Sequence, residues 1–578
     1  MRRVGTRLIA ATALCAGIAI SASSASNSVA GASPSRATAL GGQALGGQPL
    51  GRTVSTAGLS IGLSFYMPVR DHAALARFIA AVSSPGSPAY HHYLTKGEFA
   101  SDFGATPAAI HRVSDYLVAH GLGAVAASPD HLFVHATGTV HAVERLLRTT
   151  IRAYDDKGHR VYAGVTPVHL PSALTGSVRA VVGLTDVPRY RASYTVVPHA
   201  RPRTTTCSQM SAGTNATSGP FTISEIGDAY KFGAFAAKGA EGQGQTVGIF
   251  ELTNYLPSDI EYFQDCTGKH DVISSVIVDG GNGINPYAEV EADLDIEIVA
   301  TLAPYANIAV YQGPNSEAGV VDTYDRIATD DVAKVVSTSW GLCERADRTS
   351  VAAESGVFQE MAAQGQTVAA AAGDSGASDC LGYRATRTNP LAGAIGVDDP
   401  ASQPYVTGVG GTTISDAATI DSSPSSQVVW DTADVEGTGG GVSSIWPRPT
   451  YEHAIAGASG AGRTVPDVAL DADPASGYMI YTLVYGWIPV GGTSAAAPTF
   501  ASLMGLANQS NAETYGFVLP LLYAVGKAEP GTYFSDVTVG NNETYDVPGY
   551  SKAKAGFDAA SGWGSPIGSA FVSLVPPP

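Results

Sequence analysis

The chain of 578 residues has few cysteines, few basic residues and almost no long apolar run. Its 5 cysteines include no CxxC pair, so a cysteine-based zinc site is not indicated. Only 33 Lys and Arg stand against 51 Asp and Glu, and this net charge of −18 argues against nucleic acid as a partner. The one apolar run, "LIAATALCAGIAI", covers about 13 residues, short of the roughly 20 that cross a bilayer. We therefore expect neither a nucleic-acid partner nor a stable membrane association.

That apolar run has the setting of a secretory signal peptide. Three arginines precede it, and the small-residue stretch "SASSASNSVA" follows it. We assign residues 1–30 to a signal peptide and the Gly/Ala/Ser-rich residues 31–56 to a flexible leader. The protein is thus expected to be secreted and extracellular.

The cysteines outside the signal predict disulfides. Cys15 lies in the signal, and an even number of cysteines remains for the exported chain. In an oxidising compartment these four cysteines predict two disulfides. The simplest pairing joins Cys207 to Cys266 and Cys343 to Cys380, but three pairings are possible.

Charge is divided unevenly along the chain. Residues 1–206 hold 19 Lys and Arg with 9 Asp and Glu, whereas residues 207–578 hold 14 and 42. Eleven of the 13 histidines also precede residue 207. A basic segment docked on an acidic body would explain this division. We hypothesise that acid weakens the docking, because histidines such as His91 and His92 gain charge while carboxylates of the body lose it.

Residues 57–190 have the pattern of a compact α+β domain. The expected elements are a strand at 59–65, helices at 71–83 and 106–120, a strand at 131–138, a helix capped by Thr139 and a hairpin turning near 156–158. Residues 191–206 follow as a linker, and we expect cleavage between about 190 and 207.

Residues 207–578 follow a different pattern, in which short apolar runs alternate with helix-like stretches. This spacing predicts βαβ units and a parallel sheet, whose strands point their carboxyl ends at a ligand crevice. By this reasoning Glu251, Trp340 and Asp374 all lie at that edge.

The stretch "GGTSAAAP" places Ser494 at the start of a small-residue helix, with Pro498 in its first turn. A serine nucleophile needs a base, which is usually a histidine held by a carboxylate. Only His270 and His453 follow residue 206, and neither has a recognisable catalytic setting. No His-Gly-Thr stretch supports a subtilisin, and Ala496 replaces the second glycine of a Gly-x-Ser-x-Gly esterase. If Ser494 is a nucleophile, another group takes its proton.

Carboxylates are the alternative base. The stretch "AEVEADLDIEIVATLAP" predicts a helix over 288–304, on which Glu291 and Asp295 share one face. A solvated acidic face is the alternative interpretation. If the two carboxyls are buried together, one pKa rises strongly, and that group can act as base and then as acid below neutrality.

Asp374 in "AAAAGDSG" lies in a glycine-flanked turn after a predicted strand. Such an aspartate often only caps its turn. With a raised pKa it can instead donate a hydrogen bond to the oxyanion formed when Ser494 attacks a carbonyl.

In order along the chain, "EADLD", "AAAGDSG" and "GGTSAAAP" resemble the motifs of the sedolisin, or serine-carboxyl peptidase, family. The stretch "SPAYHHYLTKGEFASDFG" is similar to the family's activation prosegment. The resemblance implies an α/β fold, with a subtilisin-like parallel-sheet catalytic domain over 207–578 and a small α+β prosegment domain before it. It also implies a triad in which Ser494 attacks, Glu291 is the general base and Asp295 orients it. Asp374 would polarise the substrate carbonyl.

Three further residues resemble those of the kumamolisin branch. Glu251 in "IFELTNY" and Trp340 in "STSWG" match residues that extend the carboxylate chain behind the triad. Asp398 in "GVDDPASQPY" matches an acid near the S1 pocket, although the adjacent Asp399 departs from the branch pattern.

Residues 534–566 resemble the family's calcium loop, although acidic surface turns are the alternative interpretation. Calcium takes six to eight oxygen ligands from carboxylates and backbone carbonyls. The implied ligands are the side chains of Asp536 and Asp558 and the carbonyls of Val537, Lys554 and Gly556. Lys554 stands where the family often has glycine, so its ammonium must point away from the ion.

The sequence therefore predicts a secreted, acid-acting serine-carboxyl endopeptidase made as a self-activating proenzyme. Its partners would be protein or peptide substrates and its own prosegment as inhibitor, and we expect a monomer. A tripeptidyl exopeptidase of the same family is one alternative. A catalytically dead, calcium-stabilised binding protein is the other.

Overall fold

The computed structural model describes residues 51–196, 207, 220–269, 271–282, 289–381, 395–415, 426–432, 436–458, 460–544 and 549–576. They belong to one compact unit, Arg36–Pro578. The predicted signal peptide, residues 1–30, lies outside the described residues, as do most of the leader and much of the predicted linker. None of the helices in the described part of the chain is both long enough and apolar enough to cross a membrane.

The N-terminal domain is built on an antiparallel sheet with the strand order β3-β4-β2-β7. Its strands are β2 (Ser60–Tyr66), β3 (Gly123–Ala127), β4 (Phe133–Thr139) and β7 (Ala180–Val182). On β2 the alternating residues Ile61, Leu63 and Phe65 are buried in the domain core, as a period of two predicts. The predicted strands at 59–65 and 131–138 are thus present.

The helices of this domain are α1 (His72–Ser83), α2 (Glu98–Asp102), α3 (Pro107–Ala119) and α4 (Val140–Leu147). Both α3 and α4 pack against the sheet, whereas α1 packs against the second domain. Thr139 caps α4, because its hydroxyl accepts a hydrogen bond from the Ala142 amide at 3.2 Å. The predicted hairpin is β5 (Ile151–Asp156) and β6 (His159–Gly164). β1 (Arg52–Val54) pairs with β5, so this part of the expected leader is a strand.

The second domain contains the predicted parallel sheet, with the strand order β12-β13-β11-β14-β16-β18-β19. Its strands are β11 (Thr246–Glu251), β12 (Val272–Ile277), β13 (Asn307–Gln312), β14 (Val335–Thr338), β16 (Thr367–Ala371), β18 (Thr407–Ile414) and β19 (Gln427–Val429). β22 (Val468–Asp471) also pairs with β18. Every pair is parallel except β18 with β19.

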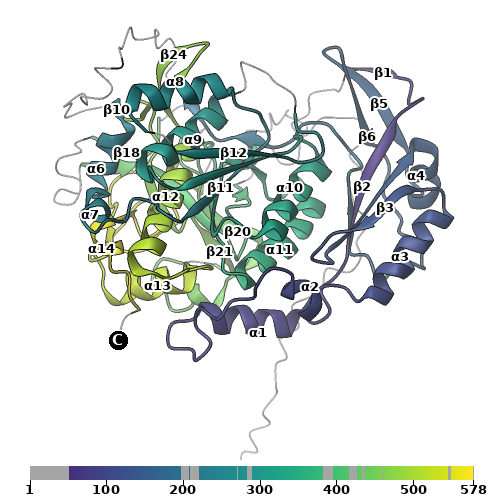
Figure 1. Ribbon diagram of the computed structural model, residues 1–578, viewed down its shortest axis with the longest axis horizontal. Coiled ribbons are helices and arrows are strands. Elements are labelled where there is room, and N and C mark those ends of the chain that lie inside the picture. The colour runs from purple at the N-terminus through teal and green to yellow at the C-terminus, as the bar shows by residue number, and fades with distance from the viewer. Residues whose placement is uncertain are drawn as a thin grey trace, which may run out of the picture. The chain divides into compact units, whose positions relative to one another are not determined.

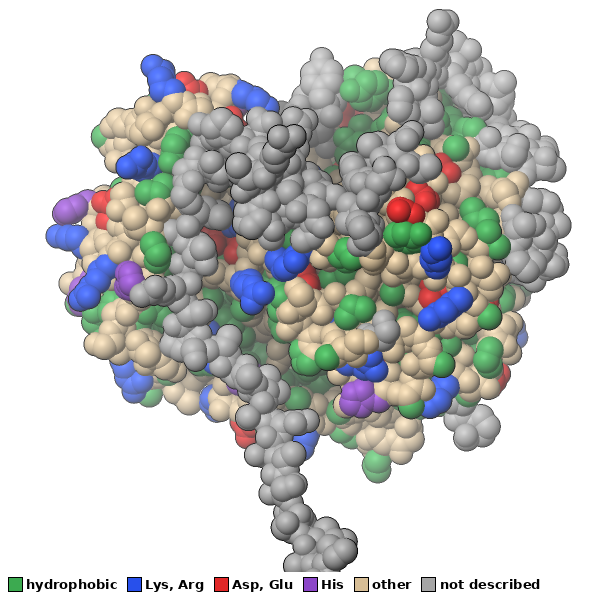
Figure 2. Space-filling view, turned by 180° about the vertical axis from the view of Figure 1, so that it is seen from behind, with side chains coloured by type: hydrophobic (Ala, Val, Ile, Leu, Met, Phe, Trp, Pro, Cys, Tyr) green, Lys and Arg blue, Asp and Glu red, His purple; other side chains and the backbone are tan. Residues whose placement is uncertain are grey.

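Two pairs of long helices pack against this sheet. α9 (Val290–Leu302) packs on α12 (Thr493–Asn511), which also contacts β14, β16 and β18. α10 (Glu317–Asp330) packs on α11 (Arg348–Ala363), and these two helices contact the N-terminal domain (Figure 1). On the face drawn in Figure 2, Lys and Arg side chains lie singly among acidic, polar and apolar ones.

Short elements complete the second domain around the sheet and its helices. The remaining helices are α6 (Ile223–Ala229), α7 (Gly233–Ala236), α8 (Pro257–Thr267), α13 (Leu519–Ala528) and α14 (Gly568–Phe571), with 3-10 turns η1 (Asp379–Leu381) and η2 (Thr450–Glu452). The remaining strands are β8 (Arg191–Ala192), β9 (Thr195–Val196), β10 (Phe221–Thr222), β15 (Trp340–Cys343), β17 (Asp398–Asp399), β20 (Gly441–Pro447), β21 (Gly462–Val465), β23 (Tyr478–Thr482), β24 (Gly486–Gly491), β25 (Phe534–Ser535) and β26 (Ser565–Pro566).

Carboxylates of α10 bind the N-terminal domain. Asp322 accepts a hydrogen bond from the Ser64 hydroxyl at 2.8 Å. Glu317 accepts two more from the backbone amides of Gly183 and Leu184, at 3.0 and 2.8 Å. The acidic body and the N-terminal segment therefore meet through specific hydrogen bonds as well as through net charge.

The described cysteines form two disulfides, in the pairing that was the simplest of the three possible ones. Cys207 is bonded to Cys266 on α8, and Cys343 at the end of β15 is bonded to Cys380 in η1. The second disulfide ties β15 to a turn that follows β16.

A buried ion pair network holds β21 in place. Arg463 is fully buried, with its guanidinium 3.0 Å from Glu452 and 2.6 Å from Asp467. Its remaining hydrogens reach the carbonyls of Gln403 and Val406. The charge is thus compensated on every side by acceptors.

Replacing Arg463 with Met should lower the free energy of unfolding by about 3–5 kcal/mol, because two buried carboxylates lose their counter-charge. Arg326→Met is the matched control, since its pair with Asp330 on α10 is largely solvated and is worth about 0.5 kcal/mol or less. Denaturant unfolding followed by tryptophan fluorescence measures both. Equal shifts in the two variants would contradict the assignment of a structural role to Arg463.

Candidate active site

The acidic helix predicted at 288–304 is α9, and all of its residues are buried. The alternative of a solvated acidic face is therefore wrong. Glu291 and Asp293 lie in the first turn, where a helix favours negative charge. Asp295 follows Glu291 by one turn, and both side chains are fully shielded from solvent. Water is thus excluded from carboxyl groups that share one helix.

Glu291, Asp295 and Glu251 form an electrostatically coupled group. Burial, and then the charges of Asp295 and Glu251, raise the pKa of Glu291 well above its ordinary value. Burial likewise raises the pKa of Asp295, and burial together with Asp295 raises that of Glu251. The Trp340 indole donates a 2.9 Å hydrogen bond to Glu251, at the end of β11. Protons on such a group come off in steps that belong to the group as a whole.

Ser494 lies in the first turn of α12, beside Glu291. Gly492, with a φ of 96°, turns the chain from β24 into this helix. The Ser494 hydroxyl is close enough to Glu291 to lower its pKa. In this structure that hydroxyl also donates a hydrogen bond, at 3.4 Å, to the carbonyl of Ser339. A shift of this contact toward Glu291 would prepare the hydroxyl for attack.

Asp374 follows β16 and points at the same helix start. Its Oδ1 accepts hydrogen bonds from the amide and the hydroxyl of Thr493, both at 2.8 Å. Burial raises the pKa of Asp374 to about 8, so the carboxyl is neutral in acid. Its Oδ2 has no hydrogen-bond partner among the described residues. A neutral carboxyl with a free oxygen can donate a hydrogen bond to a developing oxyanion.

Ser339 connects these groups, although no sequence motif indicated a role for it. Its hydroxyl donates to both oxygens of Asp295, each at 2.9 Å. The only sequence signal for it was its place directly after β14, at the edge where the parallel strands end. Ser339 therefore holds Asp295 in one orientation on the side facing the serine.

Asp398 on β17 lies behind β15 and pairs with a second acid. A hydrogen bond links it to Asp379 of η1, and a Cβ added to Gly341 would collide with its carboxylate. Burial raises the pKa of Asp379 to about 6, against the lowering effect of Arg191 and of Asp398. The predicted pocket acid is therefore one half of a carboxyl pair next to β15, and its partner Asp379 was not predicted from the sequence.

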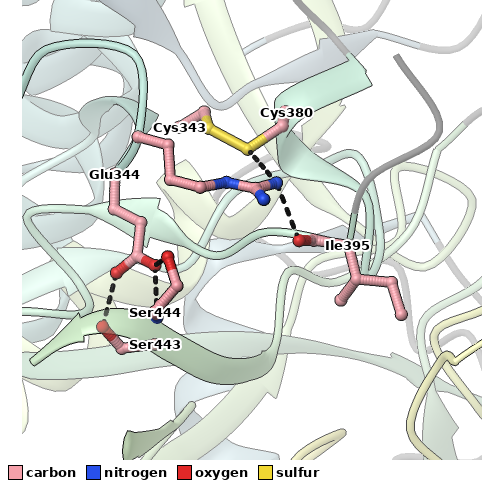
Figure 3. Close-up of a disulfide and its surroundings, with 7 residues drawn as sticks. Cys343, Glu344, Cys380, Ile395, Ser443 and Ser444 are labelled. Atoms are coloured by element: carbon pink, nitrogen blue, oxygen red, sulfur yellow. Dashed lines mark hydrogen bonds between the residues drawn. A yellow bond between two sulfur atoms is a disulfide. The ribbon is translucent and has the colours of Figure 1, made fainter. Parts of the chain in front are cut away.

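β15 is anchored where it ends. The Cys343–Cys380 disulfide lies beside the next residue, Glu344, which accepts hydrogen bonds from Ser443 and Ser444 (Figure 3). Arg345 donates to the carbonyl of Ile395 at 2.8 Å. These contacts fix the strand against which an extended peptide can pair.

The chain itself lies along this strand. β8 (Arg191–Ala192) pairs antiparallel with β15, and β9 (Thr195–Val196) pairs antiparallel with β24. Between them the Ser494 amide donates a 2.9 Å hydrogen bond to the carbonyl of Ser193. Residues assigned to a linker thus cross the candidate active site as an extended peptide.

The predicted calcium residues cluster in one loop region near β25. Asp536 accepts a hydrogen bond from the Gly556 amide, and Asp558 accepts one from the Lys554 amide, both at 2.8 Å. Burial, and then the charge of Asp558, raise the pKa of Asp536, whose Oδ1 is buried without a partner among the described residues. The Val537 carbonyl faces the same turn, through a 3.3 Å contact with Ser561. Two converging carboxylates with a free oxygen fit a hard cation such as calcium.

A second acidic group, Asp259, Glu289 and Asp293, has carboxylate oxygens within 4.8 Å of one another. Burial, with the charge of Asp259, raises the pKa of Glu289 to about 7 and that of Asp293 well above its ordinary range. In acid the carboxyls of Glu289 and Asp293 hold protons.

Comparison with known proteins agrees with this arrangement. The family described as "Pro-kumamolisin, activation domain" matches residues 53–187. Kumamolisin of Bacillus sp. (strain MN-32) is 35% identical over 508 residues, which are 84% of this chain and 86% of that protein. Tripeptidyl-peptidase 1 of Bos taurus is 27% identical over 545 residues, 88% of this chain and 90% of that protein.

A solved structure of Pseudomonas sedolisin, a serine-carboxyl proteinase complexed with two molecules of pseudo-iodotyrostatin, is similar in fold. It has a TM-score of 0.54 and 25% identity, over 62% of this chain and 98% of that one. The chain belongs to the sedolisin family of serine-carboxyl peptidases, and its N-terminal domain is the activation prosegment.

Asp374 offers a test of the oxyanion contact. Asp374→Asn keeps an oxygen for Thr493 and adds an amide donor, whereas Asp374→Ala removes the donor and should reduce kcat by about 10²–10³. Because the pKa of Asp374 is raised to about 8, the wild-type donor is lost as pH rises through that value, and the Asn donor is not. Profiles of kcat against pH compare the three forms. Equal losses in Asn and Ala variants would contradict a donor role.

Proposed function

We propose that the protein is a secreted, acid-acting endopeptidase, in which Ser494 is the nucleophile and Glu291 the general base. The observation that carries the proposal is that Ser494 lies beside Glu291, and that the Ser494 amide and the Asp374 carboxyl lie at the carbonyl of an extended peptide. The Ser494 hydroxyl lies close enough to the Glu291 carboxyl to affect its ionisation, which supports a carboxylate as the base.

The chemistry follows from the contacts. Ser494 Oγ attacks the carbonyl carbon while Glu291 accepts the hydroxyl proton of Ser494. Asp295 orients Glu291 and shares the buried negative charge with it. The Ser494 amide and the neutral Asp374 donate to the oxygen as it becomes negative. Glu291 then returns the proton to the leaving nitrogen, and water hydrolyses the acyl-enzyme.

Acid suits each of these steps. With its pKa raised to about 8, Asp374 is protonated and able to donate throughout the acid range. Glu291, Asp295 and Glu251 ionise one after another. The first of these three carboxyls to lose its proton has no negative neighbour, whereas the second and third are opposed by the charge already present. The proposal requires that these carboxyls together lose one proton in acid, and the carboxylate so formed accepts the serine proton. A histidine would be protonated and inactive there.

Cutting within chains is favoured over removal of tripeptides by the path of the peptide. The Ser193 carbonyl lies at Ser494, so Arg191, Ala192 and Ser193 occupy the three positions before the bond to be cut. The chain continues upstream of Arg191 without interruption. Upstream, Tyr190 hydrogen-bonds to Glu354 and Arg189 ion-pairs with Asp347, both buried. An exopeptidase that binds a free amino terminus would need a barrier just upstream of Arg191. Similarity to a tripeptidyl-peptidase keeps the exopeptidase as the second candidate.

The remaining parts of the proposal concern maturation. We assign export to the predicted signal, inhibition to the prosegment that covers the cleft, and stability of the C-terminal loops to calcium. Asp536 and Asp558, with the carbonyls of Val537, Lys554 and Gly556, would hold the ion. Bound calcium would neutralise the two carboxylates, and it takes no part in peptide hydrolysis.

The test uses the purified proenzyme and its Ser494→Ala variant at about pH 4, where a carboxylate base operates. We expect the wild type to digest an unfolded protein and the variant to be inactive, because the attacking oxygen is missing. Mass spectrometry of the products identifies the mode of cleavage. Products of mixed length indicate an endopeptidase, and a ladder of tripeptides indicates the exopeptidase.

The control is a wild-type sample at pH 7.5, together with a check by circular dichroism that the variant is folded. Equal digestion by the two proteins would rule out Ser494 as the nucleophile. Inactivity of a folded, calcium-loaded wild type would favour a binding protein on this fold.

A further inference from the structure

Resting on the proposed endopeptidase, we propose that the first bond the proenzyme cuts is its own Ser193–Tyr194 bond. The mature enzyme then begins at Tyr194, and the released prosegment ends at Ser193. Cleavage was expected anywhere between about 190 and 207, and the structure narrows this range to one bond.

The carbonyl of Ser193 occupies the position of a reacting carbonyl. The Ser494 amide donates to its oxygen at 2.9 Å. A Cβ added to Gly492 would collide with this oxygen, with Oδ2 of Asp374 and with Cα of Tyr194. The amide and the carboxyl expected to stabilise an oxyanion therefore surround this carbonyl, and the next residue is Tyr194.

The residues before the bond are held in register. The Ser193 amide donates to the Ser339 carbonyl at 3.0 Å, and Ala192 and Arg191 pair with Trp340 and Gly341. The charge of Arg191 lies near enough to Asp379 to affect its ionisation. A shift by one residue would break each of these contacts.

The residues after the bond are held as well. Thr195 and Val196 pair antiparallel with Gly491 and Val490 of β24. Tyr194 is half-buried, and Glu291 is among the charges acting on its hydroxyl. The chain is thus paired with a strand on each side of the Ser193–Tyr194 bond, and this bond lies next to Ser494.

The cut balances as a hydrolysis. Ser494 Oγ bonds to the Ser193 carbonyl carbon, the bond from that carbon to the Tyr194 nitrogen breaks, and the serine proton passes through Glu291 to that nitrogen. Water then adds its oxygen to the carbonyl and returns a proton to Ser494 Oγ through Glu291. The products are a carboxylate on Ser193 and an amine on Tyr194.

The experiment acidifies the full-length proenzyme to about pH 4 and quenches samples from the earliest times. Intact mass and N-terminal sequencing read both new ends, so that later trimming does not hide the first cut. We expect Tyr194 as the first new amino terminus and Ser193 as the carboxyl terminus of the prosegment. A first cut at any other bond overturns the inference.

Two variants sharpen the result. Tyr194→Pro places an imide nitrogen at the bond and should abolish cleavage there, whereas Tyr194→Phe keeps the ring and should be cut at the same position. The preparations are also given an unfolded protein. Wild-type digestion with a first cut elsewhere overturns only this inference, whereas failure of both self-cleavage and digestion overturns the proposed function.

Discussion

The exclusion of water from α9 is the constraint on which the site depends. Carboxyl groups without a neighbouring cation are costly to ionise in such a place, so they retain protons to higher pH than in solution. In the proposed mechanism, these raised pKa values make Glu291 a base that works in acid and Asp374 a hydrogen-bond donor. The same physics produces the Asp379–Asp398 pair beside β15. One physical cause, burial of carboxyls near like charges, thus accounts for the raised pKa values of Glu291, Asp374 and Asp398.

Such a site demands a rigid frame, because each proton position depends on tenths of an ångström. Glu251, Ser339 and Asp374 stand at or just beyond the ends of adjacent parallel strands, and Ser494 begins the helix that packs beneath them. The disulfide at Cys343 and the bonds of Glu344 fix the strand on which a peptide lies. The same few elements therefore hold both the extended segment 191–196 and the residues proposed for catalysis.

Much of this frame could be predicted from local patterns. The periodicity of β2, the cap at Thr139 and the alternation of strands and helices in the body needed only neighbouring residues. The hydrogen bond of Ser339 to Asp295 and the pairing of Asp379 with Asp398 join distant segments, and no local pattern encodes them. The strands at 191–196 exist only because β15 and β24 offer them partners. Their polar, proline-flanked sequence indicated a linker.

Several groups buried between the two domains also affect how tightly the prosegment docks. A change in pH acts on these groups in opposite directions. Burial and the charge of Asp130 raise the pKa values of Asp325 and Glu360, so their contribution to docking is present in acid and is lost as pH rises. Burial lowers the pKa values of His91 and His135, so their contribution is present near neutrality and is lost in acid. The hypothesis that acid weakens the docking counted the charge that acid removes from the body's carboxylates, but not the protonation that burial favours at Asp325 and Glu360. Cutting the tether removes the high effective concentration that keeps the prosegment in place, and it does so at any pH.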